Sequence, residues 1–261
     1  MDEYWNDRSE HCYIYKGEQF YTITPIPYYY QRRELVLSML DNIIKEQHIN
    51  SVFDMGCGDG EYIYNLAKNN RQISKFHGVD ISEKMIMQAR NRCAGIPKIE
   101  FEISGNGTNS VDTFSMASII CVLAHVEDSV AEMLVKNIYE HLRKDGLICI
   151  FEQIAPGEIE GNGWKRRTYI QYQELLKNAG FELVNKYNCR IDFTLHRLIF
   201  ERHIAKVFYK RKRMKNIKYE RQACNRDKLF VLLSSVFTRI SVHRKKKQLN
   251  GWGYIFLCAK K

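Results

Sequence analysis

The sequence predicts an α/β protein with a doubly wound, mostly parallel seven-stranded sheet, helices on both faces, and a basic helical insertion before the last strand. Short apolar runs alternate with amphipathic segments along most of the 261 residues, which is typical of strands joined by crossover helices. A glycine-rich turn follows the first apolar run. With 45% hydrophobic and 27% charged residues, the composition is that of a globular chain.

Each strand is predicted from a short apolar run, and each helix from apolar residues recurring every three or four positions. Ser82 is a candidate N-cap, and Gly180 a helix stop. Pro25 and Pro27 are expected to break regular structure before the first helix, and residues 144–146 to form a turn. The predicted strands are 51–55, 76–80, 99–103, 114–122, 147–151, 181–188 and 252–259. The predicted helices are 31–44, 61–70, 83–92, 130–142 and 168–179.

Charge divides the chain unevenly. The net charge is +10, yet residues 195–247 alone carry 17 Lys and Arg against 3 acids, a net of +14, which leaves −4 for the rest. We therefore expect four parts. They are an N-terminal cap segment (1–34), a core (35–194), a basic helical insertion on the acceptor side (195–247) and the last strand (248–261).

The eight cysteines are scattered and form no C-x-x-C pair, which argues against a zinc ribbon or a disulfide scaffold. We expect no metal site. The acidic, polar N-terminus is no secretory signal, and no apolar run reaches the ~20 residues of a membrane span. The expectation is a soluble, cytoplasmic protein, with peripheral membrane contact left open. The oligomeric state does not follow from the sequence.

The most informative stretch is the turn after the first strand, where Asp54 precedes Gly56, Gly58 and Gly60. Glycines at alternate positions let a ligand approach the main chain closely. A dinucleotide-binding fingerprint, G-x-G-x-x-G, that begins at Gly56 would need its third glycine at position 61, which is Glu61. Asp54 would also repel a pyrophosphate, whereas a ligand carrying an ammonium and a sulfonium group would be attracted.

This motif resembles the first motif of the Rossmann-like S-adenosylmethionine-dependent methyltransferases, and the resemblance covers roughly residues 35–188 and the closing strand. It implies that Asp54 and the three glycines hold the methionine part of S-adenosyl-L-methionine. It also implies that Asp80 binds the ribose hydroxyls and that Ile81 packs on the adenine. The alternative for Asp80 is a helix-capping acid before Ser82.

Two further candidates follow later strands. In the family an acid after the third strand reads the adenine amino group, and Asn106 can accept in its place or can be a turn residue. His125 ends a segment similar to one common in small-molecule methyltransferases and is the candidate general base. We favour the alternative that His125 only lines the pocket, but keep it as the catalytic candidate. The chain lacks the Pro-Pro and Pro-Cys motifs of the nucleobase enzymes.

Basic side chains flank the core on both sides. Arg32, beside Arg33 and after the tyrosines 28–30, is a candidate partner for the cofactor carboxylate, or packs on the surface. The insertion 195–247 has three interpretations. It is a solvated basic face, a site for a phosphate-bearing acceptor such as a nucleotide-linked sugar, or a surface for RNA or anionic membrane.

Three functions remain open from the sequence. The first is a methyltransferase acting on a small molecule, such as a sugar or phosphorylated precursor of a surface polysaccharide or secondary metabolite. The second is an RNA methyltransferase that uses the basic insertion to grip phosphates. The third is a non-catalytic module that kept the cofactor fold.

Overall fold

A computed structural model describes residues 12–15, 18–21, 26–108, 110–161, 164–189, 221–222 and 253–261. The chain forms two compact units, and each is described by itself. The first comprises Met1–Asn6, Leu35–Cys189 and Arg244–Lys261, and the second Asp7–Glu34 and Arg190–His243. Within the described ranges, no helix combines the length and the apolar character needed to cross a membrane.

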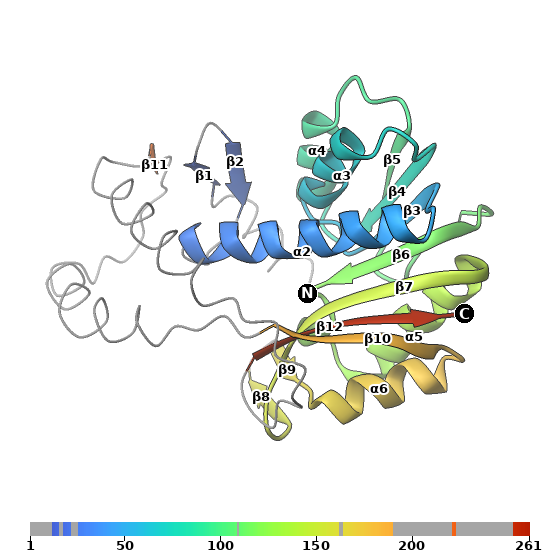
Figure 1. The fold of residues 1–261 in the computed structure, drawn as a ribbon. Helices are drawn as coiled ribbons and strands as arrows, with labels where there is room; N and C mark the ends of the chain where they lie inside the picture. The colour runs from blue at the N-terminus through green and yellow to red at the C-terminus, as the bar shows by residue number, and fades with distance from the viewer. Residues whose placement is uncertain are drawn as a thin grey trace, which may run out of the picture. The chain divides into compact units, whose positions relative to one another are not determined.

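A seven-stranded sheet forms the centre of the first unit (Figure 1). All neighbouring strands are parallel except for β12, which runs antiparallel to both β7 and β10. From β3 the chain winds outward through β4 to β5, and then returns to the other side of β3 for β6 and β7. The predicted doubly wound sheet is confirmed. In sheet order, the strands are β10 (Glu182–Cys189), β12 (Gly253–Lys260), β7 (Leu142–Ile154), β6 (Phe114–Ile120), β3 (Ser51–Met55), β4 (Lys75–Asp80) and β5 (Ile99–Ile103).

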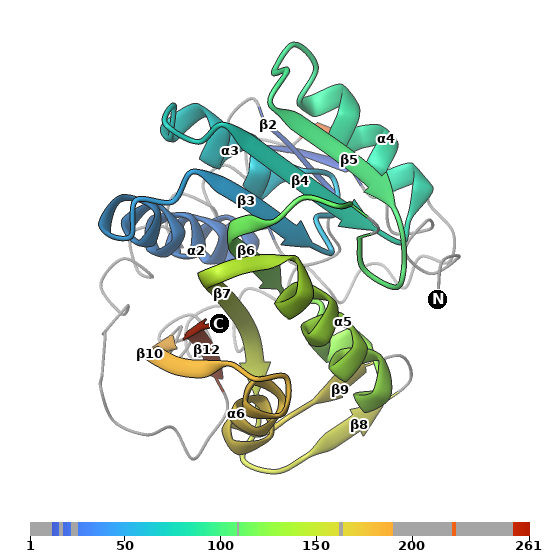
Figure 2. The same ribbon diagram turned by 90° about the vertical axis from the view of Figure 1, so that its right-hand side faces the viewer.

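Helices cover both faces of this sheet (Figure 2). On one face α5 and α6 share a single apolar core with the central strands, in which Tyr172 and Phe114 are fully buried. On the other face α3 contacts α4, and Asn70 after α3 donates to Asp41 of α2 at 2.5 Å. The helices are α2 (Ile26–Glu46), α3 (Glu61–Asn69), α4 (Glu83–Arg92), α5 (Asp128–His141) and α6 (Tyr169–Asn178).

The predicted helix boundaries have visible local causes. Ser82 caps α4, since its side chain accepts from the Met85 amide at 3.2 Å. Thr168 and Gln171 form a capping box at the start of α6, and Gly180 ends that helix region with φ 97°. The strands 51–55 and 99–103 have the predicted bounds, and the other predicted strands of the sheet differ by a few residues at one or both ends.

Three local predictions were wrong. The helix α2 begins at Ile26, so Pro27 lies in its first turn, where a proline costs no hydrogen bond. The strand predicted for 114–122 stops at Ile120, because Cys121 has φ 56° and a short 3₁₀ helix, η1 (Leu123–His125), follows. The turn predicted at 144–146 lies within β7. The hairpin of β8 (Ile159–Gly161) and β9 (Trp164–Arg166) was not predicted.

The second unit contains a small sheet. Strand β1 (Cys12–Tyr15) pairs with β2 (Glu18–Tyr21) antiparallel and with β11 (Arg221–Gln222) parallel. The predicted basic helical insertion, 195–247, lies outside the described residues except for β11, where the structure has a strand rather than a helix. The division of the chain into cap, core and insertion stays a prediction.

Candidate functional site

Two acidic residues lie at the carboxyl ends of neighbouring strands, beside the point where the winding reverses. Asp54 on β3 is 3% exposed, and Ser118 of β6 donates to its Oδ1 at 2.6 Å. Burial raises the pKa of Asp54 to about 7, although the Ser118 bond opposes the shift and the nearby charge of Asp80 adds to it. Asp54 is therefore poised to ionise fully when a positive charge approaches.

Asp80, the last residue of β4, links the glycine loop to the start of α4. Its Oδ2 accepts from the Gly58 amide and its Oδ1 from the Ser82 amide, both at 2.9 Å. Burial raises the pKa of Asp80 above its usual range, against the effect of these amide bonds. Because each carboxylate oxygen can accept more than one hydrogen bond, the helix-capping role and a role in ribose binding are compatible.

The glycine loop is shaped by close packing on one side and is open on the other. The amides of Gly56 and Cys57 both donate to Val79 O, at 2.8 and 2.9 Å. A Cβ on Gly56 would lie 2.3 Å from Val122 Cγ2, so this position accepts only glycine. At Gly58, which has φ 55°, no heavy atom lies within 4 Å of a Cβ position. The main chain at Gly58 is thus open to a ligand.

An ion pair that was not predicted fastens this loop to α4. Asp59 is 8% exposed, and Arg92 donates through Nη2 to its Oδ2 at 2.5 Å and through Nε to its carbonyl at 3.1 Å. Burial raises the pKa of Asp59, and Arg92 lowers it. The available signal was an acid inside the loop and an arginine in the last turn of the next helix, but only the fold brings them together.

The predicted adenine-side residues lie at the same edge of the sheet. The Ser104 amide donates to Asp80 O at 2.9 Å, and a Cβ on Gly105 would lie 2.9 Å from Ile81 Cδ1. The loop after β5 therefore packs directly against Ile81. Asn106 is exposed in this loop, and its amide donates to Ser104 Oγ at 3.3 Å. Adenine binding by Ile81 and Asn106 stays a prediction.

His125 and Arg32 complete the predicted set. His125 ends η1 in a half-buried position, and its amide donates to Val122 O at 2.9 Å. Because Val122 also packs against Gly56, η1 begins next to the glycine loop. Arg32 is half-buried on α2 and belongs to the second unit. The catalytic role of His125 and the cofactor contact of Arg32 remain predictions.

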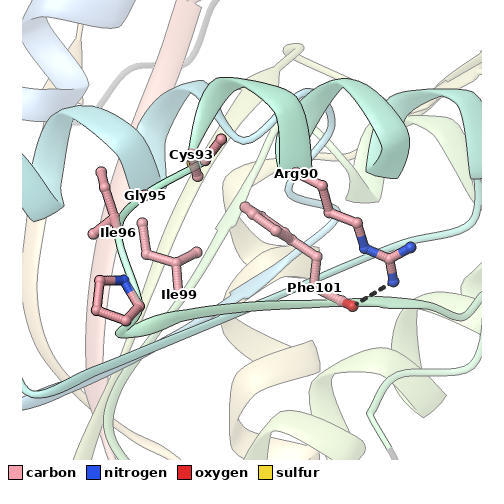
Figure 3. Close-up of a pocket in the computed structure, with 8 residues that line it drawn as sticks. Arg90, Cys93, Gly95, Ile96, Ile99 and Phe101 are labelled. Atoms are coloured by element: carbon pink, nitrogen blue, oxygen red, sulfur yellow. Dashed lines mark hydrogen bonds between the residues drawn. The ribbon is translucent and has the colours of Figure 1, made fainter.

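A separate cavity of about 580 Å³ lies between the end of α4 and the start of β5 (Figure 3). Its wall is mostly apolar, and Arg90 spans it by donating to the carbonyl of Phe101 at 2.9 Å. Loops that precede a parallel strand lie at the edge opposite the glycine loop, so this cavity is not the candidate site. The lining residues are Arg90, Cys93, Ala94, Gly95, Ile96, Pro97, Ile99 and Phe101.

Comparison with known proteins gives a family for the part of the chain that carries the site. Residues 52–146 match the family described as "Methyltransferase domain". A carboxy-S-adenosyl-L-methionine synthase of Nautilia profundicola is 23% identical over 163 residues, which is 62% of this chain and 68% of that protein. The protein of that name from Helicobacter pylori strain HPAG1 is 27% identical over 132 residues, 49% of this chain and 55% of that protein. The chain thus spans about two thirds of the first relative and about half of the second.

Solved structures share the fold. An O-methyltransferase from a trans-AT PKS multienzyme of Brevibacillus brevis, in complex with S-adenosyl-L-homocysteine, has a TM-score of 0.60 at 19% identity. The match covers 91% of this chain and 77% of that one. The [4+2]-cyclase SpnF has a TM-score of 0.51 at 17% identity, with 81% and 75% covered. Since a cyclase shares the fold, the reaction class rests on the family match rather than on the fold.

The geometry of the site fits the cofactor of that family. The open main chain at Gly58 and the two buried carboxylates suit a ligand that carries a cationic amino-acid tail and a ribose. The family match covers the glycine loop, Asp54, Asp80 and η1. Residues 52–146, which carry the candidate site, therefore form a methyltransferase domain of the S-adenosylmethionine-dependent, Rossmann-like kind.

Proposed function

We propose that this methyltransferase transfers a methyl group to a small molecule, such as a sugar or a phosphate-bearing precursor of a surface polysaccharide or secondary metabolite. The observation that carries the cofactor half of the proposal is the pair Asp54 and Asp80 on either side of an open glycine loop. S-adenosylmethionine supplies an activated methyl group on a sulfonium. The protein's task is therefore to align the acceptor with that group and to exclude water.

Each predicted side chain then has a role. Asp54 favours the cationic methionine part by its charge, and Asp80 accepts from the ribose hydroxyls with the lone pairs that the amides leave. Ile81 and Asn106 hold the adenine, and Arg32 pairs with the cofactor carboxylate. His125 takes a proton from the acceptor where the acceptor must lose one.

The charge distribution supports a phosphate-bearing acceptor. Residues 195–247 carry a net charge of +14, and the remainder of the chain a net of −4. Clustered Lys and Arg attract anionic ligands, and phosphate is one of the groups that these side chains bind with charge-assisted hydrogen bonds. The structural relative from Brevibacillus brevis is an O-methyltransferase of a polyketide multienzyme, which is consistent with a small acceptor.

A second candidate follows from the sequence relatives, which are named carboxy-S-adenosyl-L-methionine synthases. On this alternative the product is a modified cofactor rather than a methylated acceptor. RNA methylation is the third possibility, because the same basic segment could hold a nucleic acid backbone.

One labelling experiment separates these functions. The full chain is incubated with methyl-labelled S-adenosylmethionine and a panel of nucleotide sugars and sugar phosphates, and in parallel with total RNA and with small-molecule cell extract. The proposal expects label in a small phosphorylated product. Label in RNA would contradict it, as would a carboxylated cofactor detected by mass spectrometry in the extract. At S-adenosylmethionine concentrations below saturation, Asp54→Asn should lower labelling by about 10-fold, and Asp112→Asn, a half-exposed acid paired with Lys75, should not.

A further inference from the structure

The backbone becomes left-handed for one residue after the end of β6, next to the glycine loop. Cys121 has φ 56°, a left-handed conformation that is uncommon for a residue other than glycine, and Val122 returns to φ −105° and ψ −48°. Successive residues of opposite hand turn their N–H groups toward one point and make a concave anion site. The Leu123 amide donates a hydrogen bond at 2.6 Å to a carboxylate oxygen at this site. The amides of Val122 and Ala124 also donate toward the same carboxylate.

The acceptor is Glu152 of β7. Its side chain is 0% exposed, and Oε1 receives the Leu123 bond. Within the described part of the chain, the second oxygen, Oε2, has no hydrogen-bond partner. A buried carboxylate that is only partly satisfied is costly to keep, so its presence calls for a role other than packing.

Arg167 holds the same turn from its carbonyl side. It is 3% exposed, and it donates through Nη1 to Leu123 O and through Nη2 to Val126 O, the latter at 2.9 Å. Its Nε donates to Asp128 Oδ1 at 2.9 Å. Glu152 and Arg167 thus bind the amide and the carbonyl groups of one short turn. The attraction between their two charges offsets only part of the free-energy cost of burying them.

The turn that they hold, residues 121–126, connects the two halves of the candidate site. At its start Val122 packs against Gly56, the glycine that accepts no side chain. At its end lies His125, three residues along η1. A shift of this turn would move both the wall of the cofactor loop and the candidate base. A displacement of about 1 Å in such a position can cost about 100-fold in rate.

We propose that Glu152, with Arg167 opposite it, is a positioning residue of methyl transfer, whose buried carboxyl group holds the turn 121–126 against the cofactor loop. The effect of Glu152 on catalysis rests on the proposed function, whereas the contact of Glu152 with the turn does not. Neither residue touches the reacting atoms. Both act through Val122 and His125.

The grip should weaken as the pH rises through neutrality, because a raised pKa means that the folded turn favours the protonated carboxyl group. Burial raises the pKa of Glu152 to about 7, against the amides of η1 and the charge of Arg167, which lower it. The other ionisable groups around the pair include Tyr172 of α6, whose pKa burial raises well above its usual range, Asp128 of α5, whose pKa its basic partners lower, and Cys121 and His125 of the turn itself. Of the two carboxyl groups, Glu152 is therefore the one that changes charge across neutral pH, and Glu152→Gln separates its effect from those of the other groups.

The test follows the amides of the turn by hydrogen exchange in the ligand-free protein, corrected for intrinsic rates at pH 6 and pH 8. Glu152→Gln keeps the shape and an oxygen for the Leu123 amide but removes the charge. Glu158→Gln, an exposed acid paired with Lys165 on the neighbouring hairpin, is the matched control. We expect protection of residues 122–124 in the wild type to fall by about 10-fold from pH 6 to pH 8, because an opened turn returns the Glu152 carboxyl group to its usual pKa and lets it ionise. Protection should not change with pH in Glu152→Gln, which stays neutral, and should follow the wild type in Glu158→Gln.

Protection that is independent of pH in the wild type would overturn the proposal, and this arm needs no variant to fold. The same pH dependence in wild type and Glu152→Gln would do the same. Once an acceptor is identified, Glu152→Ala, which removes the acceptor of the Leu123 amide, should lower kcat by about 10-fold or more, while Kd for S-adenosylhomocysteine changes by less than about threefold. If no acceptor is found, the proposed function fails, but the exchange result still decides the role of Glu152.

Discussion

Asp54 offers the most direct test of the cofactor site, since its ionisation should depend on whether a cationic ligand is bound next to it. Its pKa of about 7, against the usual 3.8, means that ionising it in the ligand-free site costs about 4 kcal/mol more than in water. The attraction of a bound cationic ligand offsets part of this free-energy cost. We therefore expect binding of S-adenosylhomocysteine, which carries the ammonium group, to release a proton from Asp54 near neutral pH.

The size of the effect follows from this pKa. If only the ionised form binds well, the ionised fraction rises from about 0.09 at pH 6 to about 0.76 at pH 7.5, so wild-type affinity should rise about eightfold. The range ends below pH 8, where an α-amino group begins to lose its own proton. Asp54→Asn keeps an oxygen that can accept from Ser118. It should bind about 10-fold more weakly at pH 7.5 and with little pH dependence.

Titration calorimetry in two buffers of different ionisation enthalpy measures both the affinity and the number of protons released. Asp112→Asn is the control for loss of a negative charge elsewhere on the domain, because Asp112 pairs with Lys75 away from the glycine loop. Wild-type affinity and a wild-type pH profile in Asp54→Asn would refute the reasoning. Unchanged proton release in that variant would refute it independently.

Three other predictions use the same domain. Gly58→Ala and Gly95→Ala place a methyl group in open space at positive φ, so each should lose about 1 kcal/mol of stability in urea unfolding, but only Gly58→Ala should weaken binding of S-adenosylhomocysteine. His125→Ala should lower turnover more than cofactor affinity, and equal losses in a steady-state and binding comparison would make it a packing residue. The pKa values of Asp54 and Glu152 lie near 7 in the fold, above their unfolded values, so the folded state favours their protonated forms. The unfolding free energy of the ligand-free protein should therefore fall by roughly 2–3 kcal/mol per group between pH 5 and pH 8, and urea midpoints that rise with pH would contradict this.

The strands and caps of the core followed from local signals. An apolar run closed by a glycine turn is sufficient to place 51–55, and a serine before an amphipathic run is sufficient to place the start of α4. Pro27 misled the prediction because a proline that breaks a helix in its interior is tolerated in its first turn. The left-handed Cys121 could not be foreseen, since nothing in its side chain favours positive φ over the strand that precedes it.

The cofactor residues were predicted as separate points, and the contacts between them were not. Asp80 reaches the amide of Gly58, which lies 22 positions earlier in the chain, and Asp59 meets Arg92 across 33 positions. Glu152 gave no signal at all, because an acid in an apolar run is normally assigned to an exposed position. Such pairings depend on the order of strands in the sheet, which periodicity alone does not determine.

The position of β12 has a consequence for how the protein is made. This strand lies between β7 and β10, and every backbone pairing of β10 in the described sheet is with β12. Until the ribosome has released residues 253–260, β7 therefore presents a long unpaired edge of buried residues to other nascent chains. A stop codon at position 253, which deletes this strand, would leave the cofactor loop intact and would still be expected to yield aggregated protein.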